Sequence, residues 1–110
     1  YAIKNDTFRE IIESPWHSTP GTNVHPDGIT FYSTMLKNLS DTTVTDGQIL
    51  GGKTGYTSEA GHCLASFAEI DGLEYILVTG GAAGTGIPHI NDAVTIYNRL
   101  GEAALALNGN

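Results

Sequence analysis

The 110-residue sequence has few basic residues, one cysteine and no apolar run of the 18 residues that a membrane-spanning helix needs. A single cysteine excludes an internal disulfide and any zinc or iron–sulfur centre built on cysteines. Five Lys and Arg residues against twelve Asp and Glu residues give a formal net charge of −7, which argues against a nucleic-acid surface. With 40% hydrophobic and 15% charged residues, the composition predicts a globular domain.

Helical periodicity appears at both ends of the chain. Asp6 to Glu13 predicts a short helix with Asp6 as its N-cap and Ser14-Pro15 as its end. A longer helix is expected from Pro88 to Leu107, with Pro88 in its first turn. Its apolar stripe consists of Ile90, Ala93, Val94, Tyr97, Leu100, Ala104 and Leu107.

Between these helices the pattern changes from connector to strand. Residues 14–28 hold three prolines and two glycines and predict an extended connector with turns, and residues 31–39 favour a helical segment. Thr42–Thr45 is strand-like. Cys63–Ile70 and Leu73–Thr79 flank Asp71-Gly72, which is a strong hairpin signal.

The expected fold class is therefore α+β, with an antiparallel sheet and flanking helices. The nearly continuous apolar run Leu73–Val78 predicts a strand that is buried on both faces. One terminal helix covers one face of a sheet. We therefore expect the 110 residues to be an incomplete domain.

A glycine-rich run before the second half of the chain has two interpretations. Gly47 to Thr54 matches the phosphate-loop pattern G-x-x-x-x-G-K-[ST], in which Lys53 would meet phosphates and Thr54 a magnesium ion. A phosphate loop needs a buried strand before it and a helix after it, and the flanking residues favour neither. The alternative places Lys53-Thr54-Gly55 on a strand, where an ammonium and a hydroxyl could receive a peptide carboxylate.

The residues around this tripeptide carry a family resemblance. The sequence Gly52-Lys53-Thr54-Gly55-Tyr56-Thr57 is followed by Glu59-Ala60-Gly61, by Cys63-Leu64, and after a glycine turn by Tyr75-Ile76-Leu77-Val78. This arrangement closely resembles the C-terminal part of serine-type D-alanyl-D-alanine carboxypeptidases, the low-molecular-mass penicillin-binding proteins related to serine β-lactamases. The resemblance is specific over residues 47–82 and weaker over both terminal helices, and residues 14–46 depart from it.

That family uses three motifs, S-x-x-K, S-x-N and K-T-G, of which the third is present. None of the six serines is followed by Lys three positions later or by Asn two positions later. The chain also begins at Tyr1 without an initiator Met or a signal peptide. We therefore expect residues 1–110 to be the C-terminal portion of a single catalytic domain with a β-lactamase/transpeptidase-like fold, and to be inactive alone.

The resemblance also implies roles for the residues of the third motif. Lys53 would supply positive charge in the catalytic groove, and Thr54 would hold the terminal carboxylate of a D-Ala-D-Ala peptide. Gly55 would let another backbone approach the strand, and the Tyr56 N–H would be one of two oxyanion-hole donors. The complete enzyme would trim peptidoglycan stem peptides through an acyl-enzyme.

Its implied partners are D-Ala-D-Ala-terminated peptides, β-lactams and the N-terminal portion of the same protein, with no nucleic acid, cofactor or metal. The implied location is the extracytoplasmic cell envelope. A non-catalytic remnant that binds D-Ala-D-Ala peptides is the alternative from the binding class.

Other chemistry-bearing residues have plainer interpretations. His62 and Cys63 are neighbours on an expected strand and would point to opposite faces, which disfavours a Cys–His pair, and Cys63 is expected to be a small buried hydrophobe. The histidines at 17, 25, 62 and 89 lack metal-ligand spacing. Glu59 is expected in a solvated loop, and Gly80–Gly86 in a strand-to-helix connector.

Overall fold

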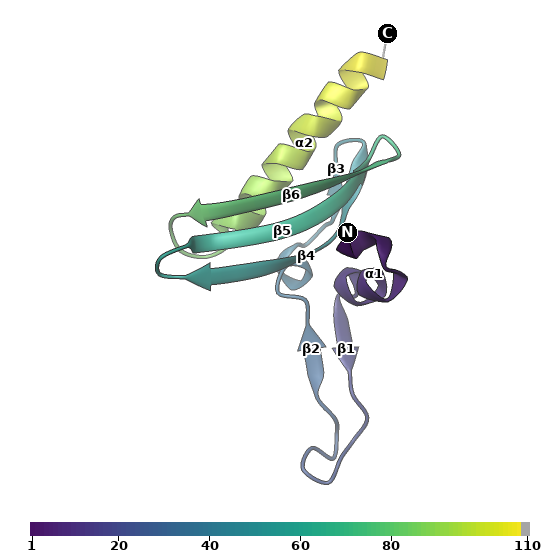
Figure 1. The fold of residues 1–110 in the computed structure, drawn as a ribbon, viewed down its shortest axis with the longest axis vertical. Helices are drawn as coiled ribbons and strands as arrows, with labels where there is room; N and C mark the ends of the chain where they lie inside the picture. The colour runs from purple at the N-terminus through teal and green to yellow at the C-terminus, as the bar shows by residue number, and fades with distance from the viewer. Residues whose placement is uncertain (109–110) are drawn as a thin grey trace.

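The computed structural model describes residues 1–108 and has two helices and two antiparallel sheets (Figure 1). This confirms the α+β class. The helices are α1 (Asp6–Glu13) and α2 (Pro88–Asn108), and two single 3-10 turns span Ala2–Lys4 and Leu36–Asn38. The strands are β1 (Trp16–Ser18), β2 (Thr30–Tyr32), β3 (Thr43–Val44), β4 (Gly47–Thr57), β5 (Gly61–Ile70) and β6 (Leu73–Ala82).

The main sheet has the strand order β3-β4-β5-β6, with every neighbouring pair antiparallel. The β5–β6 hairpin turns at Asp71 and Gly72, whose φ angles are 53° and 73°. Two consecutive positive φ angles are what the tight hairpin turn of this twist requires, and Asp-Gly tolerates them well. The expected hairpin is therefore confirmed.

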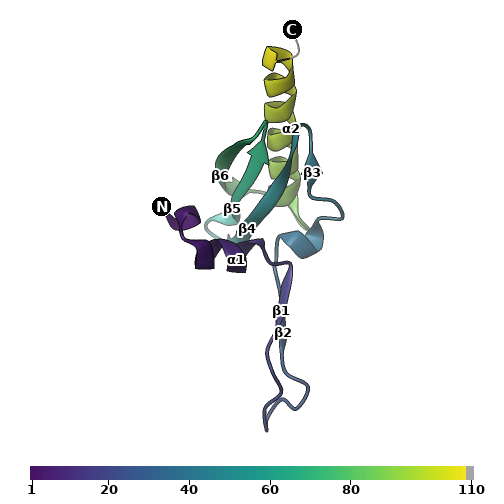
Figure 2. The ribbon, with the colours of Figure 1, turned by 90° about the vertical axis from the view of Figure 1, so that its right-hand side faces the viewer.

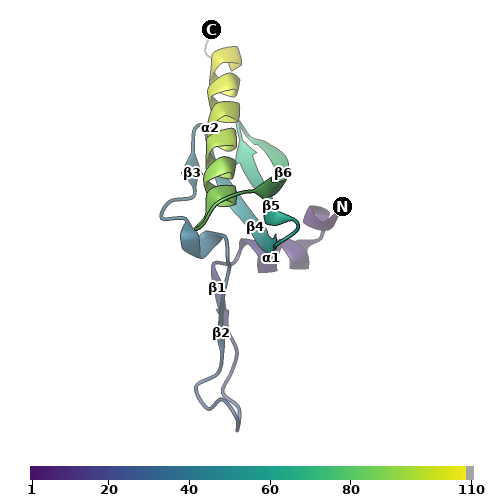
Figure 3. The ribbon, with the colours of Figure 1, turned by 90° about the vertical axis from the view of Figure 1, so that its left-hand side faces the viewer.

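The helices lie on opposite faces of this sheet (Figures 2 and 3). On one face α2 packs Ile90, Ala93 and Tyr97 against the strands. The buried Tyr97 hydroxyl lies 2.9 Å from Ser66 Oγ of β5. The remaining buried members of this core are Met35, Val44, Ile49, Leu64, Ala68 and Ile70.

Gly101 allows α2 to pack closely against the residue that follows β3. A Cβ at the buried Gly101 would overlap the carbonyl oxygen of Thr45, just after β3. Beyond this point the helix extends past the strands (Figure 1). Leu107 is consequently 83% exposed, which corrects its expected place in the core stripe.

On the opposite face α1 buries none of its residues. Its N-cap is Asn5, whose Oδ1 accepts a hydrogen bond from the Phe8 N–H at 3.0 Å. The expected helix bounds are confirmed, but Asp6 is not the cap, because Asn5 already has extended backbone and supplies the accepting oxygen.

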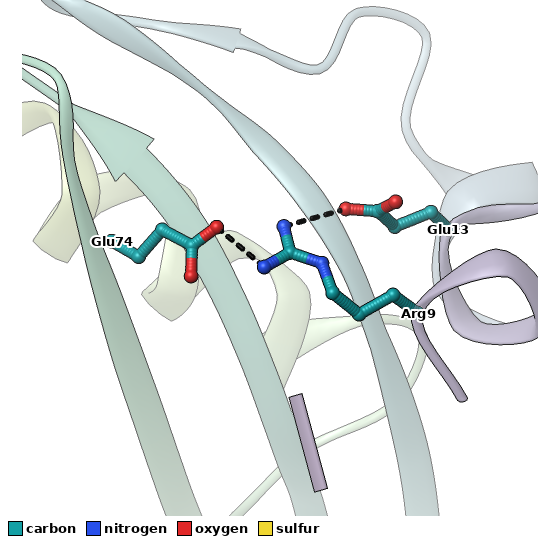
Figure 4. A network of polar contacts seen from close by, with 3 residues as sticks. All are labelled: Arg9, Glu13 and Glu74. Atoms are coloured by element: carbon teal, nitrogen blue, oxygen red, sulfur yellow. Dashed lines mark hydrogen bonds and ion pairs between the residues drawn. The ribbon is translucent and has the colours of Figure 1, made fainter. Parts of the chain in front are cut away.

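Arg9 links α1 to the far edge of the sheet (Figure 4). Its guanidinium lies 3.2 Å from Glu13 of the same helix and 2.6 Å from Glu74 of β6. It also lies 5.5 Å from the centre of the Phe67 ring on β5. The carboxylates of Glu74 and Glu13 hold the pKa of Arg9 above its ordinary value.

Two expectations for residues 14–39 are wrong. The connector contains β1, which pairs with β2 through Trp16↔Tyr32 and Ser18↔Thr30 and projects from the body of the molecule (Figure 1). The expected 31–39 helix is instead the end of β2, the buried Met35 and a single 3-10 turn. The backbone groups of β1 and β2 pair with each other. Pro15 precedes β1, and Pro20 and Pro26 lie in the loop between the strands, so none of them prevents strand formation.

Strand β6 is also exposed where burial was expected. Ile76 is 60% and Val78 73% exposed, because α2 covers one face of β6 and α1 reaches it mainly through Arg9. Within residues 1–108, the outer edge of β6 pairs with no strand. Of the helices in that range, none has the length and apolar character needed to cross a bilayer.

Candidate functional site at the edge of β4

Residues 47–54 form the first part of a continuous strand, not a loop. Gly47 to Thr57 are all in β4, and a turn and strand β5 follow. A phosphate loop requires a turn of free backbone N–H groups leading into a helix. The phosphate-loop interpretation is therefore wrong, and Lys53-Thr54-Gly55 is on a strand as the alternative expected.

The second half of β4 is a sheet edge. Strand β3 pairs with Gly47 and Gln48 alone. From Lys53 to Thr57, β4 pairs with β5 on one side, and within residues 1–108 no strand pairs with its other side. A row of unpaired backbone groups at an edge can accept a further extended chain. This edge runs beside all four residues that the sequence analysis selected.

Alternation along β4 distributes these residues over the two faces of the sheet. A Cβ at Gly51 would meet the Ile12 carbonyl of α1, whereas a Cβ at Gly52 would meet Met35 in the α2-side core. Lys53 therefore faces the α1 side, and Thr54 and Tyr56 face the α2 side. The two glycines allow α1 and Met35 to pack directly against the strand.

Lys53 is exposed beside two shallow hollows. They measure about 230 Å³ and about 220 Å³, and both are lined by Gly52, Lys53 and Ile12. The aromatic rings of Trp16, Phe31 and Tyr32 border the first hollow. The ammonium group of Lys53 donates to the Thr54 carbonyl oxygen at 2.6 Å, so this cation lies against the exposed backbone of β4.

Thr54 has a partner that the sequence analysis missed. Its hydroxyl donates to Thr34 Oγ1 at 2.6 Å. Thr34 lies 20 positions earlier, between β2 and Met35, and no spacing pattern connects the two threonines. The pair puts a second hydroxyl beside the first, so a group that accepts hydrogen bonds could meet both.

Gly55 and Tyr56 leave the end of the edge accessible. A Cβ at Gly55 would have no atom within 4 Å, so the space beside it is open to another chain. Tyr56 is 65% exposed, and its ring centroid lies 4.7 Å from that of His62, its cross-strand partner. The structure thus brings Lys53, Thr54, Gly55 and Tyr56 to one accessible edge.

The neighbouring histidine and cysteine do not form a catalytic pair. His62 turns toward Tyr56 and toward His89, whose ring stacks on it at 4.8 Å. The Cys63 thiol lies 3.6 Å from the Ala60 carbonyl oxygen. The residue is half-buried, not buried as expected. The register of β5 against β6 shifts between His62 and Leu64, at this residue. Residues 1–108 contain no cluster of three metal-ligating side chains.

Glu59 lies in the exposed β4–β5 turn, as expected. Its own backbone N–H and then the Ser58 hydroxyl lower the pKa of its carboxyl. A general acid requires the opposite shift, since it must keep its proton near neutral pH. Glu59 is thus an exposed turn residue, and the direction of its pKa shift does not favour a role as general acid.

Comparison with known proteins supports the fold and does not establish an activity. The molecule is an α+β protein with an accessible Lys-Thr-Gly edge on an antiparallel sheet. Its structure is similar to the crystal structure of the D-alanyl-D-alanine carboxypeptidase from Mycobacterium tuberculosis H37Rv, with a TM-score of 0.65 and 21% sequence identity. The similarity covers 88% of this chain and 34% of that one, so the chain spans about a third of the length of the solved carboxypeptidase.

The sequence comparisons add nothing to this result. No protein-family model matches the chain, and no curated protein matches it significantly. The D-alanyl-D-alanine carboxypeptidase-like fold therefore rests on the structural likeness.

Proposed function

We propose that this chain is the substrate-carboxylate and oxyanion portion of a serine-type D-alanyl-D-alanine carboxypeptidase of the cell envelope. The observation that carries the proposal is the accessible β4 edge, which presents Lys53-Thr54-Gly55-Tyr56 on the fold of such an enzyme. Lys53 is the catalytic residue of the set and supplies positive charge beside the reacting groups. Thr54, Gly55 and Tyr56 bind the substrate.

The proposed binding mode uses the strand edge and its side chains together. A peptide ending in D-Ala-D-Ala lies in extended form along residues 53–57, where Gly55 leaves room for its backbone. Its terminal carboxylate replaces the Thr54 carbonyl as the partner of the Lys53 ammonium and replaces Thr34 as the partner of the Thr54 hydroxyl. Charge-assisted hydrogen bonds of this type are about twice as strong as neutral ones.

The Tyr56 backbone N–H is the proposed oxyanion donor. Removing one such donor typically lowers the rate about 100-fold or more. The nucleophile and its base belong to a segment with S-x-x-K and S-x-N, which these 110 residues do not contain. We propose that this segment is the N-terminal portion of the same protein and that it completes the domain. Alone, the chain has no side chain that can be acylated by the family's mechanism.

Binding is tested by titrating the chain with an N-acylated peptide ending in D-Ala-D-Ala while recording amide chemical shifts. We expect shifts at residues 52–57 that disappear when the peptide carboxylate is replaced by a carboxamide. Lys53→Ala removes a hydrogen bond between charged groups and should weaken binding about tenfold or more. Lys37→Ala, at an exposed lysine elsewhere, should leave binding unchanged. Equal binding to both peptide forms would contradict the proposal.

Acylation is tested with a labelled penicillin and intact-mass analysis. The chain alone should gain no covalent adduct, whereas the chain expressed together with the residues encoded upstream of Tyr1 should gain one. A covalent adduct on the isolated chain would contradict the proposed division of the site. Peptide binding without an adduct in the longer protein would favour the non-catalytic binding module.

A further inference from the structure

Three aromatic rings from three elements lie in contact at the end of the proposed site. Tyr56 of β4 contacts His62 of β5 at 4.7 Å, and His62 stacks on His89 of α2 at 4.8 Å with an interplanar angle of 15°. His62 Nε2 also lies 3.1 Å from the carbonyl oxygen of Gly84, in the loop that leads into α2. The cluster therefore ties the Tyr56 end of β4 to the start of α2.

The hydrogen bond to Gly84 assigns the proton on His62. A carbonyl oxygen can only accept, so His62 Nε2 carries the proton in the bond to Gly84. His89 is 5% exposed, and its buried Nδ1 has no hydrogen-bond partner. A buried bare nitrogen is tolerated on a neutral ring far better than a buried unpaired N–H of a cation.

The surrounding charges do not favour a cation at His89. Burial is the main cause that lowers the pKa of His89, the neighbouring His62 lowers it further, and Asp92 on α2 opposes both. The other titratable groups at this end are Tyr56 on β4, Glu59, whose carboxylate is bound within its own turn, and Cys63 on β5. Among the described residues of β6, Glu74 lies at the opposite end and pairs with Arg9.

We propose that His62 and His89 are positioning residues that hold the Tyr56 end of β4 in its binding geometry while the His89 ring is neutral, and release it when His89 is protonated. Protonation puts a cation against the face of a second imidazole and gives the buried Nδ1 a proton without an acceptor. The stack must then open, and Tyr56 loses the ring that supports it. This inference rests on the proposed function, because it concerns the same peptide-binding edge.

The test follows the histidine rings and the Tyr56 amide through a pH titration by NMR, without any ligand. The pKa of His89 is lowered, so we call its titration the lower step, and the Tyr56 amide shift should follow it. In His89→Phe, which keeps a ring but cannot take up a proton, the lower step should be absent. His25→Asn, at an exposed histidine in the β1–β2 loop, is the matched control and should retain the lower step.

Peptide binding supplies the second measurement. In the wild-type chain the affinity for the D-Ala-D-Ala peptide should fall up to tenfold per pH unit below the lower step, as one proton competes with one ligand. In His89→Phe the affinity should be flat over the same range and close to wild type at neutral pH.

The two proposals fail in different ways. The positioning role is overturned if the Tyr56 amide shift does not change at the lower step, or if it still changes there in His89→Phe. If the Tyr56 amide shift follows the lower step as expected but the chain binds no peptide at any pH, the positioning role is supported and the proposed function is overturned instead.

Discussion

On one face of the main sheet α2 buries Ile90, Ala93 and Tyr97, whereas on the other face α1 buries no residue at all. The α2 face has a continuous core and a buried side-chain hydrogen bond. The α1 face has two shallow hollows and an ion-pair link through Arg9. Strand β4 separates them, with Thr54 and Tyr56 toward the packed face and Lys53 toward the open one.

This asymmetry divides stability from accessibility. Apolar burial is the main source of folding free energy, so the α2 face carries most of it. The α1 face leaves Lys53 beside accessible space, which suits a group that must meet a ligand. We therefore expect changes on the α2 face to act on global stability and changes on the α1 face to act locally.

The largest effect is expected where α2 approaches β3. Gly101→Ala gains about 1 kcal/mol of helix propensity, but the new Cβ would overlap the Thr45 carbonyl oxygen. Backbone cannot yield as a flexible side chain does, so the overlap dominates. We expect a net loss of about 2 kcal/mol or more, equivalent to a fall in Tm of about 10 °C in a thermal melt.

Gly55→Ala is the matched control, because its Cβ would meet nothing within 4 Å. Its Tm should stay within about 3 °C of wild type, while peptide binding at the β4 edge should weaken. If both alanine variants melt alike, close packing of α2 is not the main determinant of stability.

A smaller effect is expected for the buried hydrogen bond on the same face. Tyr97→Phe removes the partner of Ser66 Oγ and leaves that hydroxyl buried. Chemical denaturation should show a loss of about 1.5 kcal/mol in the free energy of unfolding. Tyr32→Phe, on the exposed β2 strand, should change it by less than about 0.5 kcal/mol. Equal small losses would mean that Ser66 finds another partner.

The comparison also explains which elements the sequence could predict. Helix α2 and the β5–β6 hairpin have strong local signals, a 3.6-residue apolar period and an Asp-Gly turn, and tertiary packing agrees with them. The β1–β2 hairpin has no such signal. Its strands are three residues each, and Pro15, Pro20 and Pro26 beside them favour the prediction of an irregular connector. The exposure of Ile76 and Val78 could not be predicted either, since the apolar run does not state which faces are covered.

The candidate site divides in the same way. The placement of Lys53-Thr54-Gly55 on a strand could be inferred from local sequence, because glycines follow where a phosphate loop would need a helix. The contact between Thr54 and Thr34 and the stack of His62 on His89 join residues at least 20 positions apart. Only the pairing of β4 with β5 and the docking of α2 bring these groups together.

Acidification should destabilise the α2 face in a defined pH window. The pKa of His89 is lowered from its ordinary value of 6.5, so below about that pH the unfolded chain binds protons that the folded chain does not. Stability should therefore fall as the pH decreases from near 6.5 toward the lowered value in the folded state. His89→Phe should flatten this part of the stability curve, and His25→Asn should not.

The acid window of His89 is separate from that of the carboxyl groups. Asp41 and Glu59 also have lowered pKa values, but from ordinary values of 3.8 and 4.5, so their contribution is lost at lower pH. Urea denaturation between pH 7.5 and 5.5 isolates the histidine effect. A stability that is constant over that range in the wild-type chain would contradict the assignment.

The smallest effect is expected on the open face. Arg9→Gln breaks the links from α1 to Glu13 and Glu74, while α2 and its core remain in place. Amide hydrogen exchange should become faster over α1 and stay unchanged over α2 and β5, because α1 contributes no buried residue to the core. High salt should produce part of the same change in the wild-type chain, since ionic strength screens exposed ion pairs.

Arg99→Gln, at an exposed arginine on α2, is the matched control and should leave α1 unaffected. If α1 keeps its protection without Arg9, apolar contacts of Phe8 and Ile12 hold the helix, and the open face is more firmly packed than its exposed residues suggest.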